Sequence, residues 1–252
     1  MIVPLNLMRW GDPAAPRTVV ALHGITANAG AFARPARLLA EKGWQVLAPD
    51  MRGHGESARG DGDFGTAALL GDLAAAIPTA PDVLIGHSFG GYLAQVGVLD
   101  GLFRPRALLL EDPVSHFADQ AVPAAMLSAD ETSLPRTIEG LMALNPGWSR
   151  LDAAWKLVSL EQIRFADARA AFSGNAPWDL RSQARVVADR QPTVWVMPVE
   201  SRFVPPDDQE RLLAEVPRDC VEIWEGVGHS VHRDAVERFV DLVVALDRRR
   251  RT

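Results

Sequence analysis

The sequence lacks the features of a disulfide-stabilised or membrane-spanning protein. It contains a single cysteine, Cys220, so no disulfide can form within the chain. This usage fits a reducing compartment. No apolar stretch approaches the roughly 18 residues of a membrane-spanning helix, and no basic region followed by a long apolar core opens the chain. We therefore expect a cytoplasmic protein with no membrane partner.

Basic charge is also scarce. The 26 Lys and Arg residues are outnumbered by 32 Asp and Glu residues, for a formal net charge of −6 at pH 7. The arginine run at 248–251 is local and is typical of cations near a helix C-terminus or of a solvated tail. We expect no nucleic-acid partner, because a broad basic surface is missing. The composition leaves the oligomeric state open.

Short apolar runs alternate with helical patterns over most of the chain. Continuous runs of this length are typical of parallel strands buried on both faces. The alternation predicts an α/β fold in which a mostly parallel sheet is flanked by helices. The predicted strands are 18–22, 45–48, 83–85, 107–110, 193–197 and 221–224. The predicted helices between and after them are 32–42, 67–77, 91–99, 207–215 and 235–246.

The alternation stops between residues 113 and 192. This stretch is too long for a plain loop, and it is rich in Ala, Leu, Arg and Trp. We expect a core domain formed by 1–112 and 193–252 and a helical cap formed by 113–192. The cap should cover the carboxyl edge of the sheet, where ligands bind in open α/β folds. The cap helices are predicted at 121–128, 134–143, 151–158, 160–172 and 181–189.

The segment Gly86–Gly90 has the pattern G-x-S-x-G, centred on Ser88. It lies between a predicted strand and a predicted helix, where such a turn projects the serine hydroxyl above the sheet. The glycines on either side supply the necessary room. The free N–H groups of the following helix face any developing anion. The pattern predicts that Ser88 is a nucleophile.

His229 is the predicted partner of Ser88. It ends the glycine-rich segment that starts at Gly226, directly after the last predicted strand. From there its ring can turn back over the sheet edge and take the proton from the serine. The other histidines considered for this role are His23, His54, His87, His116 and His232.

The loop after the first core strand supplies a candidate oxyanion site. We expect His23 to shape this loop rather than to act as a base. The backbone N–H groups of Ile25 and Phe89 are predicted to converge on one oxygen. Loss of one such donor typically slows a reaction roughly 10²- to 10³-fold.

Together these motifs resemble the α/β-hydrolase fold superfamily. The resemblance covers the chain outside the insertion and implies a helical cap where the insertion lies. The N-terminal part of the sheet looks shortened, since few residues precede the first core strand. A serine nucleophile separates this chain from the epoxide hydrolases and haloalkane dehalogenases of the superfamily, which need a carboxylate there. The motifs are His23-Gly24, Asp50 to Ser57, Gly86 to Gly90 and Gly228-His229.

The acid of the catalytic set departs from the commonest pattern of the superfamily. Many members place an aspartate in the loop after the strand that resembles 193–197, where this chain has Ser201. A subgroup of small esterases with serine in that loop uses an earlier acid, at the end of the strand that follows the nucleophile's helix. That resemblance favours Asp112 as the acid. Glu200 and Glu111 remain alternatives.

The serine nucleophile and the resemblance predict a carboxylesterase-type hydrolase that works through an acyl-enzyme, without a cofactor or metal. Aromatic residues in the insertion indicate an apolar or aromatic small-molecule substrate. Two alternatives remain open, namely a carbon–carbon bond hydrolase of a ring-cleavage dienoate and a non-catalytic small-ligand receptor of the same fold. The candidate pocket residues are His116, Trp148, Trp178 and Arg202.

Overall fold

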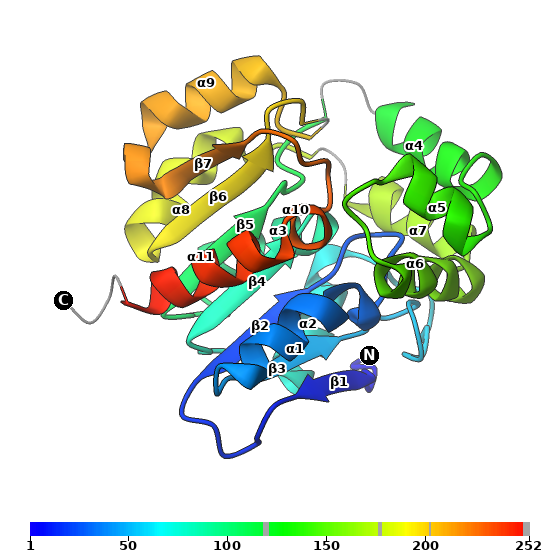
Figure 1. The fold of residues 1–252 in the computed structure, drawn as a ribbon, viewed down its shortest axis with the longest axis horizontal. Helices are drawn as coiled ribbons and strands as arrows, with labels where there is room; N and C mark the ends of the chain where they lie inside the picture. Colours follow the sequence, from blue (N-terminus) through cyan, green and yellow to red (C-terminus); the bar gives the residue numbers. More distant parts are fainter. Residues whose placement is uncertain (118–120, 176–177, 202, 249–252) are drawn as a thin grey trace.

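The computed structural model describes residues 1–117, 121–175, 178–201 and 203–248. Seven strands in this part of the chain form one sheet with the order β1-β3-β2-β4-β5-β6-β7 (Figure 1). β1 runs antiparallel to β3, and every other pair is parallel. The predicted fold class is confirmed. The strands are β1 (Leu7–Trp10), β2 (Thr18–Leu22), β3 (Gln45–Pro49), β4 (Val83–His87), β5 (Ala107–Glu111), β6 (Thr193–Pro198) and β7 (Val221–Trp224).

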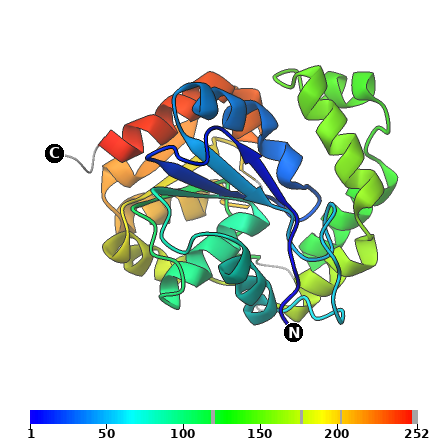
Figure 2. The same ribbon diagram turned by 90° about the horizontal axis from the view of Figure 1, so that it is seen from below.

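Helices cover both faces of the sheet (Figure 2). Side chains alternate between faces along a strand, so Val19 and Ala21 of β2 enter one core while Val20 and Leu22 enter the other. This double burial explains the continuous apolar runs. The helices on one face are α1 (Ala33–Glu41) and α11 (Val236–Arg248). Those on the other are α2 (Thr66–Ala76), α3 (Phe89–Leu99), α8 (Ala184–Arg190) and α9 (Pro206–Glu215).

Four further helices gather beside one end of the sheet in both views (Figures 1 and 2). α5 packs against α6, and α4 packs against α7. The start of α6 is fixed by a capping box between Ser149 and Asp152. Leu160, Phe165 and Phe172 join this group to the core that lies over α2 and α3. The helices are α4 (Ala121–Thr132), α5 (Ile138–Leu144), α6 (Arg150–Gln162) and α7 (Phe165–Gly174).

The structure differs from the sequence-based expectation at several places. The break expected at residue 159 lies instead at 163–164, between α6 and α7, and α4 runs to Thr132. α8, expected inside the cap, instead packs against α3 and α9 on the face of the sheet, so the helices at the sheet end are α4 to α7. α5 begins at Ile138, after Pro135, because Thr137 caps it. The edge strand β1 was not predicted, since its partly exposed residues form no apolar run.

No helix in the described ranges is both long and apolar enough to cross a membrane. The arginines at 249–251 lie outside the described residues.

Candidate active site

Ser88 occupies a tight turn between β4 and α3. Its backbone has φ 53° and ψ −115°, a conformation that is costly for a residue with a side chain. The Ser88 N–H donates to the carbonyl of Glu111 at 3.0 Å, which ties the turn to β5. A Cβ on Gly86 would lie 2.7 Å from the carbonyl oxygen of Gly90, and one on Gly90 would lie 2.3 Å from that of Leu22. The two glycines therefore permit the close packing that the motif predicts.

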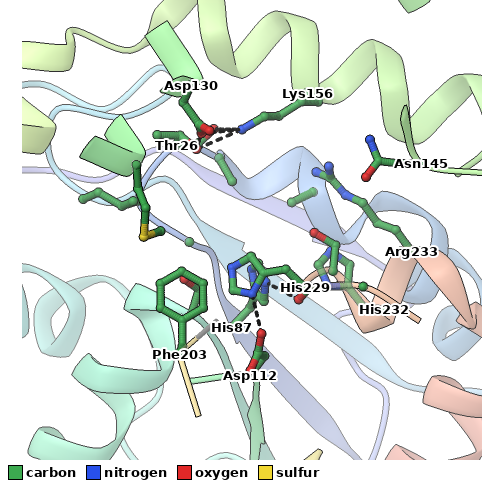
Figure 3. Close-up of a pocket in the computed structure, with 18 of the residues that line it drawn as sticks. Thr26, His87, Asp112, Asp130, Asn145, Lys156, Phe203, His229, His232 and Arg233 are labelled. Carbon is green, nitrogen blue, oxygen red and sulfur yellow. Dashed lines mark hydrogen bonds and ion pairs between the residues drawn. The ribbon is translucent and has the colours of Figure 1, made fainter. Parts of the chain in front are cut away.

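Asp112 and His229 form a hydrogen-bonded pair beside this turn. Asp112 follows β5 with a φ of 36° and is fully buried. His229 lies on the loop after β7, and its Nδ1 donates to Asp112 Oδ2 at 2.7 Å (Figure 3). The Phe203 ring packs on the imidazole, with 4.4 Å between centroids. About a third of the His229 side chain is exposed, at 35%, so its outer edge faces the cavity described below.

Ser201 supports Asp112 directly. Its Oγ donates to Asp112 Oδ1 and accepts the backbone N–H groups of Phe203 at 3.1 Å and Val204 at 2.8 Å. Both oxygens of the buried carboxylate thus have donors, as burial of a charge requires. Ser201 stands where many members of the superfamily have an aspartate. In this chain its hydroxyl instead binds the carboxylate of Asp112.

The two alternative acids lie elsewhere. Glu200 is exposed at the edge of the cavity. Glu111 is fully buried and accepts the backbone N–H of His232 at 2.8 Å and the Nδ1–H of the same ring at 2.7 Å. Burial raises the pKa of Glu111 and holds the pKa of His232 well below its usual range. Glu111 therefore belongs to a second, enclosed histidine–carboxylate pair.

His87 lies between the two pairs. Its Nε2–H donates to the backbone carbonyl of His229 at 3.0 Å, and its ring packs 4.5 Å from that of His229. His87, Glu111 and His232 are also the group of described residues that could share a metal ion, with ligand atoms within 4.8 Å of one another. The hydrogen bonds from His232 already occupy the carboxylate of this group.

Two backbone N–H groups lie close to Ser88 in the chain or in space. Gly24 comes so close that a Cβ on it would lie 3.3 Å from the Cβ of Ser88. In the described part of the chain, the N–H groups of the next residue, Ile25, and of Phe89 at the start of α3 have no acceptor. The structure therefore leaves both predicted oxyanion donors available.

His23 stabilises the loop that carries Ile25. Its Nε2 accepts the backbone N–H of Met51 at 3.0 Å, and its Nδ1–H donates to the carbonyl of Gly24 at 2.8 Å. Burial lowers the pKa of His23 to about 4, so the ring is neutral at pH 7. This geometry agrees with a loop-shaping histidine.

Helices α4 and α6, at the end of the sheet, form hydrogen bonds with the same loop. The Thr26 carbonyl accepts from Lys156 Nζ at 3.0 Å and from Ser159 Oγ at 3.1 Å, both on α6. The Thr26 hydroxyl donates to Asp130 of α4 at 2.6 Å (Figure 3). Burial lowers the pKa of Lys156 to about 8. Sequence reasoning missed Lys156, because a lysine on a helix is usually solvated.

These groups surround a cavity of about 510 Å³ between the carboxyl ends of the strands and the cap helices. That volume is in the range of small-molecule sites. Ser88, Asp112 and His229 line its floor. The cap contributes apolar side chains, namely Met126, Leu127, Leu134, Leu141, Leu144 and Trp148.

Only some of the predicted pocket residues line the cavity. Trp148 lines the cavity, whereas Trp178 and His116 are not among its lining residues. Trp178 packs instead against Tyr92, with 4.3 Å between ring centroids. The His116 ring turns toward Asp208, with Nδ1 3.9 Å from Oδ2. Both predictions relied on position in the chain alone. Arg202 lies outside the described residues.

Comparison with known proteins gives the family. Residues 19–242 match the model of the alpha/beta hydrolase family. The chain belongs to this family. The sn-1-specific diacylglycerol lipase ABHD11 of Mus musculus is 24% identical over 253 residues, which cover 93% of this chain and 82% of the lipase.

Solved structures share the fold. The enol-lactonase from Burkholderia xenovorans superposes with a TM-score of 0.76 at 17% identity and covers 97% of this chain and 96% of its own. The meta-cleavage product hydrolase from Pseudomonas fluorescens gives a TM-score of 0.73 at 19% identity, over 97% of this chain and 94% of its own. The family and its lipase relative support hydrolase activity for this chain.

Proposed function

We propose that the protein is a serine hydrolase that cleaves carboxylic esters through an acyl-enzyme. The contact between His229 Nδ1 and Asp112 Oδ2, 2.7 Å long and in a cavity that Ser88 also lines, carries the proposal. A histidine held through Nδ1 presents Nε2 as the base for a serine hydroxyl. The relative that is named a diacylglycerol lipase supports an ester as the bond cleaved.

In the proposed reaction, His229 Nε2 takes the proton of Ser88 Oγ as this oxygen attacks the ester carbonyl carbon. The ring then gives that proton to the leaving oxygen, which departs as the alcohol and leaves the acyl group on Ser88. Water, deprotonated by His229, hydrolyses the acyl-enzyme and restores the hydroxyl. Asp112 orients the ring and stabilises its cationic form. The N–H groups of Ile25 and Phe89 bind the oxyanion.

The lining of the cavity supports the predicted substrate class. Apolar cap side chains face the region above Ser88, which favours an apolar or aromatic group next to the scissile bond. We propose a small-molecule ester as the substrate.

Labelling with a fluorophosphonate, followed by peptide mass spectrometry, tests the nucleophile. We expect the label on Ser88 in the wild type and none in Ser88→Ala. Ser230→Ala is the matched control, because Ser230 also lines the cavity and its side chain makes no capping hydrogen bond. Normal ester turnover by Ser88→Ala would overturn the proposal.

A substrate panel separates the ester hydrolase from its alternatives. The panel pairs short p-nitrophenyl esters with a ring-cleavage dienoate, which is included because one structural neighbour is a meta-cleavage product hydrolase. Turnover of the dienoate without turnover of esters would identify a carbon–carbon bond hydrolase. Ligand binding without turnover or labelling would identify a receptor.

A further inference from the structure

One wall of the cavity carries a buried cation without an anionic partner. Arg233 lies on α10 (Val231–Asp234), shortly after His229, and lines the cavity (Figure 3). Trp148 also lines the cavity. Only 4% of Arg233 is exposed, and its guanidinium carbon lies 4.5 Å from the centroid of the Trp148 ring. Within the described ranges, Arg233 Nε has no hydrogen-bond partner, and no carboxylate lies within ion-pair distance of the guanidinium.

The surrounding carboxylates do not balance this charge. Three of them, Asp152, Glu111 and Asp234, favour the cationic form of Arg233. Burial nevertheless lowers the pKa of Arg233 to about 10, so the side chain is a cation at neutral pH. Each of the three is already bonded elsewhere: Asp152 to Arg34 and Ser149, Glu111 to His232, and Asp234 to the backbone N–H of Gly228.

The acids of the cavity itself are also engaged or remote. Asp112 accepts from His229 and Ser201, and Asp130 accepts from Thr26 and pairs with Lys156 at 3.5 Å. Glu200 is exposed. Within the described ranges, none of these acids forms an ion pair with Arg233.

Trp148 adds a second, independent donor on the same wall. Its Nε1–H is buried and has no hydrogen-bond partner among the described residues. An unsatisfied buried donor costs free energy, and a buried unpaired charge costs more. The terminal nitrogens of Arg233 are not fully covered, so a ligand oxygen in the cavity can reach them.

On the basis of the proposed ester hydrolase function, we propose that its substrate carries a carboxylate, which Arg233, packed on the Trp148 ring, binds beside the scissile ester. The planar guanidinium fork matches the two oxygens of a carboxylate. A single guanidinium balances a single negative charge, which favours a carboxylate over a phosphate dianion. Because Arg233 follows His229 on the same short segment, the bound anion also fixes the position of the ester relative to the base.

Paired substrates test this proposal. The p-nitrophenyl hemiesters of glutaric, adipic and suberic acid are compared with the p-nitrophenyl esters of pentanoic, hexanoic and octanoic acid, which match them in chain length. For at least one pair we expect a kcat/KM that is roughly 10- to 100-fold higher for the anionic ester, the range of a hydrogen bond to a charged group. Arg233→Met should abolish this preference.

Two conservative variants keep the test informative if Arg233→Met folds poorly. Arg233→Lys retains the charge without the fork, so it should keep part of the preference. Trp148→Phe retains the ring beneath the guanidinium and removes only the Nε1–H, so its loss of preference should be smaller than that of Arg233→Met.

A binding measurement separates this proposal from the proposed function. In Ser88→Ala, heptanoate should raise the Tm more than heptanamide or diethyl phosphate, and Arg233→Met should remove the difference. A stronger effect of diethyl phosphate would overturn the carboxylate assignment. Wild-type turnover of esters with no anionic preference would overturn this inference alone, whereas a wild type that hydrolyses no ester would overturn the proposed function.

Discussion

Two histidine–carboxylate pairs lie side by side at the carboxyl end of β5, yet they differ in access to solvent. Asp112 and His229 meet at the floor of the cavity, and 35% of the His229 side chain is exposed. Glu111 and His232, their near neighbours in sequence, are both fully buried. The positive φ of Asp112 turns the chain at this point, so adjacent acids serve different histidines. Access to the cavity, rather than residue type, distinguishes the pair that we propose to act with Ser88.

The enclosed pair holds the fold together around the open one. Glu111 accepts both the backbone N–H and the ring N–H of His232 and thereby fixes α10 to the end of β5. The His232 ring also packs against Phe32 and Phe239, at 4.7 Å and 6.0 Å between centroids. We infer a structural role for this pair.

Replacing each histidine by alanine should separate the two roles most strongly. His229→Ala should lower kcat by roughly 10⁴- to 10⁶-fold, as loss of a catalytic base does elsewhere. His232→Ala should instead lower the free energy of unfolding by about 2–4 kcal/mol. Steady-state kinetics and urea unfolding measure both effects. A stable but inactive His232→Ala would contradict the comparison.

Replacing Ser201 should affect the pair formed by Asp112 and His229 and not the pair formed by Glu111 and His232. Ser201→Ala removes a donor from the Asp112 carboxylate, and a hydrogen bond to a charged group is worth about 1.5–3 kcal/mol. We expect kcat/KM to fall by roughly 10- to 100-fold for this reason. The exposed Ser182 supplies the control, and Ser182→Ala should behave as the wild type. An unchanged kcat/KM in Ser201→Ala would show that Asp112 needs no such support.

Acid should act mainly on the buried histidines. Burial lowers the folded-state pKa values of His23, His54, His87 and His232. Below pH 6.5 the unfolded chain therefore binds more protons than the folded chain. The free energy of unfolding decreases as the pH is lowered, by at most about 1.4 kcal/mol per pH unit for each such group. The raised pKa of Glu111 acts in the opposite direction and offsets one of them.

Urea unfolding at pH 7 and pH 5 measures this loss. His232→Gln should reduce the difference between the two pH values, because the variant lacks one of the titrating groups. A wild-type stability that is equal at both values would contradict the lowered pKa values of the buried histidines.

The sequence predicted the features that depend on local pattern. The six apolar runs are strands because both faces of the sheet are covered. Ser88 lies on the expected turn because only glycine fits two residues before it and two residues after it. Ser201 in place of an acid pointed to Asp112 through the family resemblance. The hydrogen bond between Asp112 and His229 agrees with that interpretation.

Features that depend on packing between distant segments could not be read from the sequence. α8 follows the cap in sequence but packs on α3. His116 and Trp178 follow β5 in the stretch expected to form the cap, yet they do not line the cavity. Arg233 and Lys156 line it, although a charged residue on a helix is usually solvated. Their burial depends on partners that lie far away in the chain.

The rate constant for fluorophosphonate labelling of Ser88 tests the central claim most directly, because it reports the reactivity of the serine apart from substrate binding. Asp112→Asn should lower this constant by roughly 10³- to 10⁴-fold. Glu111→Gln and Glu200→Gln should stay within about tenfold of the wild type, since neither acid contacts His229 in this account. Slow labelling of Glu111→Gln or Glu200→Gln together with rapid labelling of Asp112→Asn would contradict it.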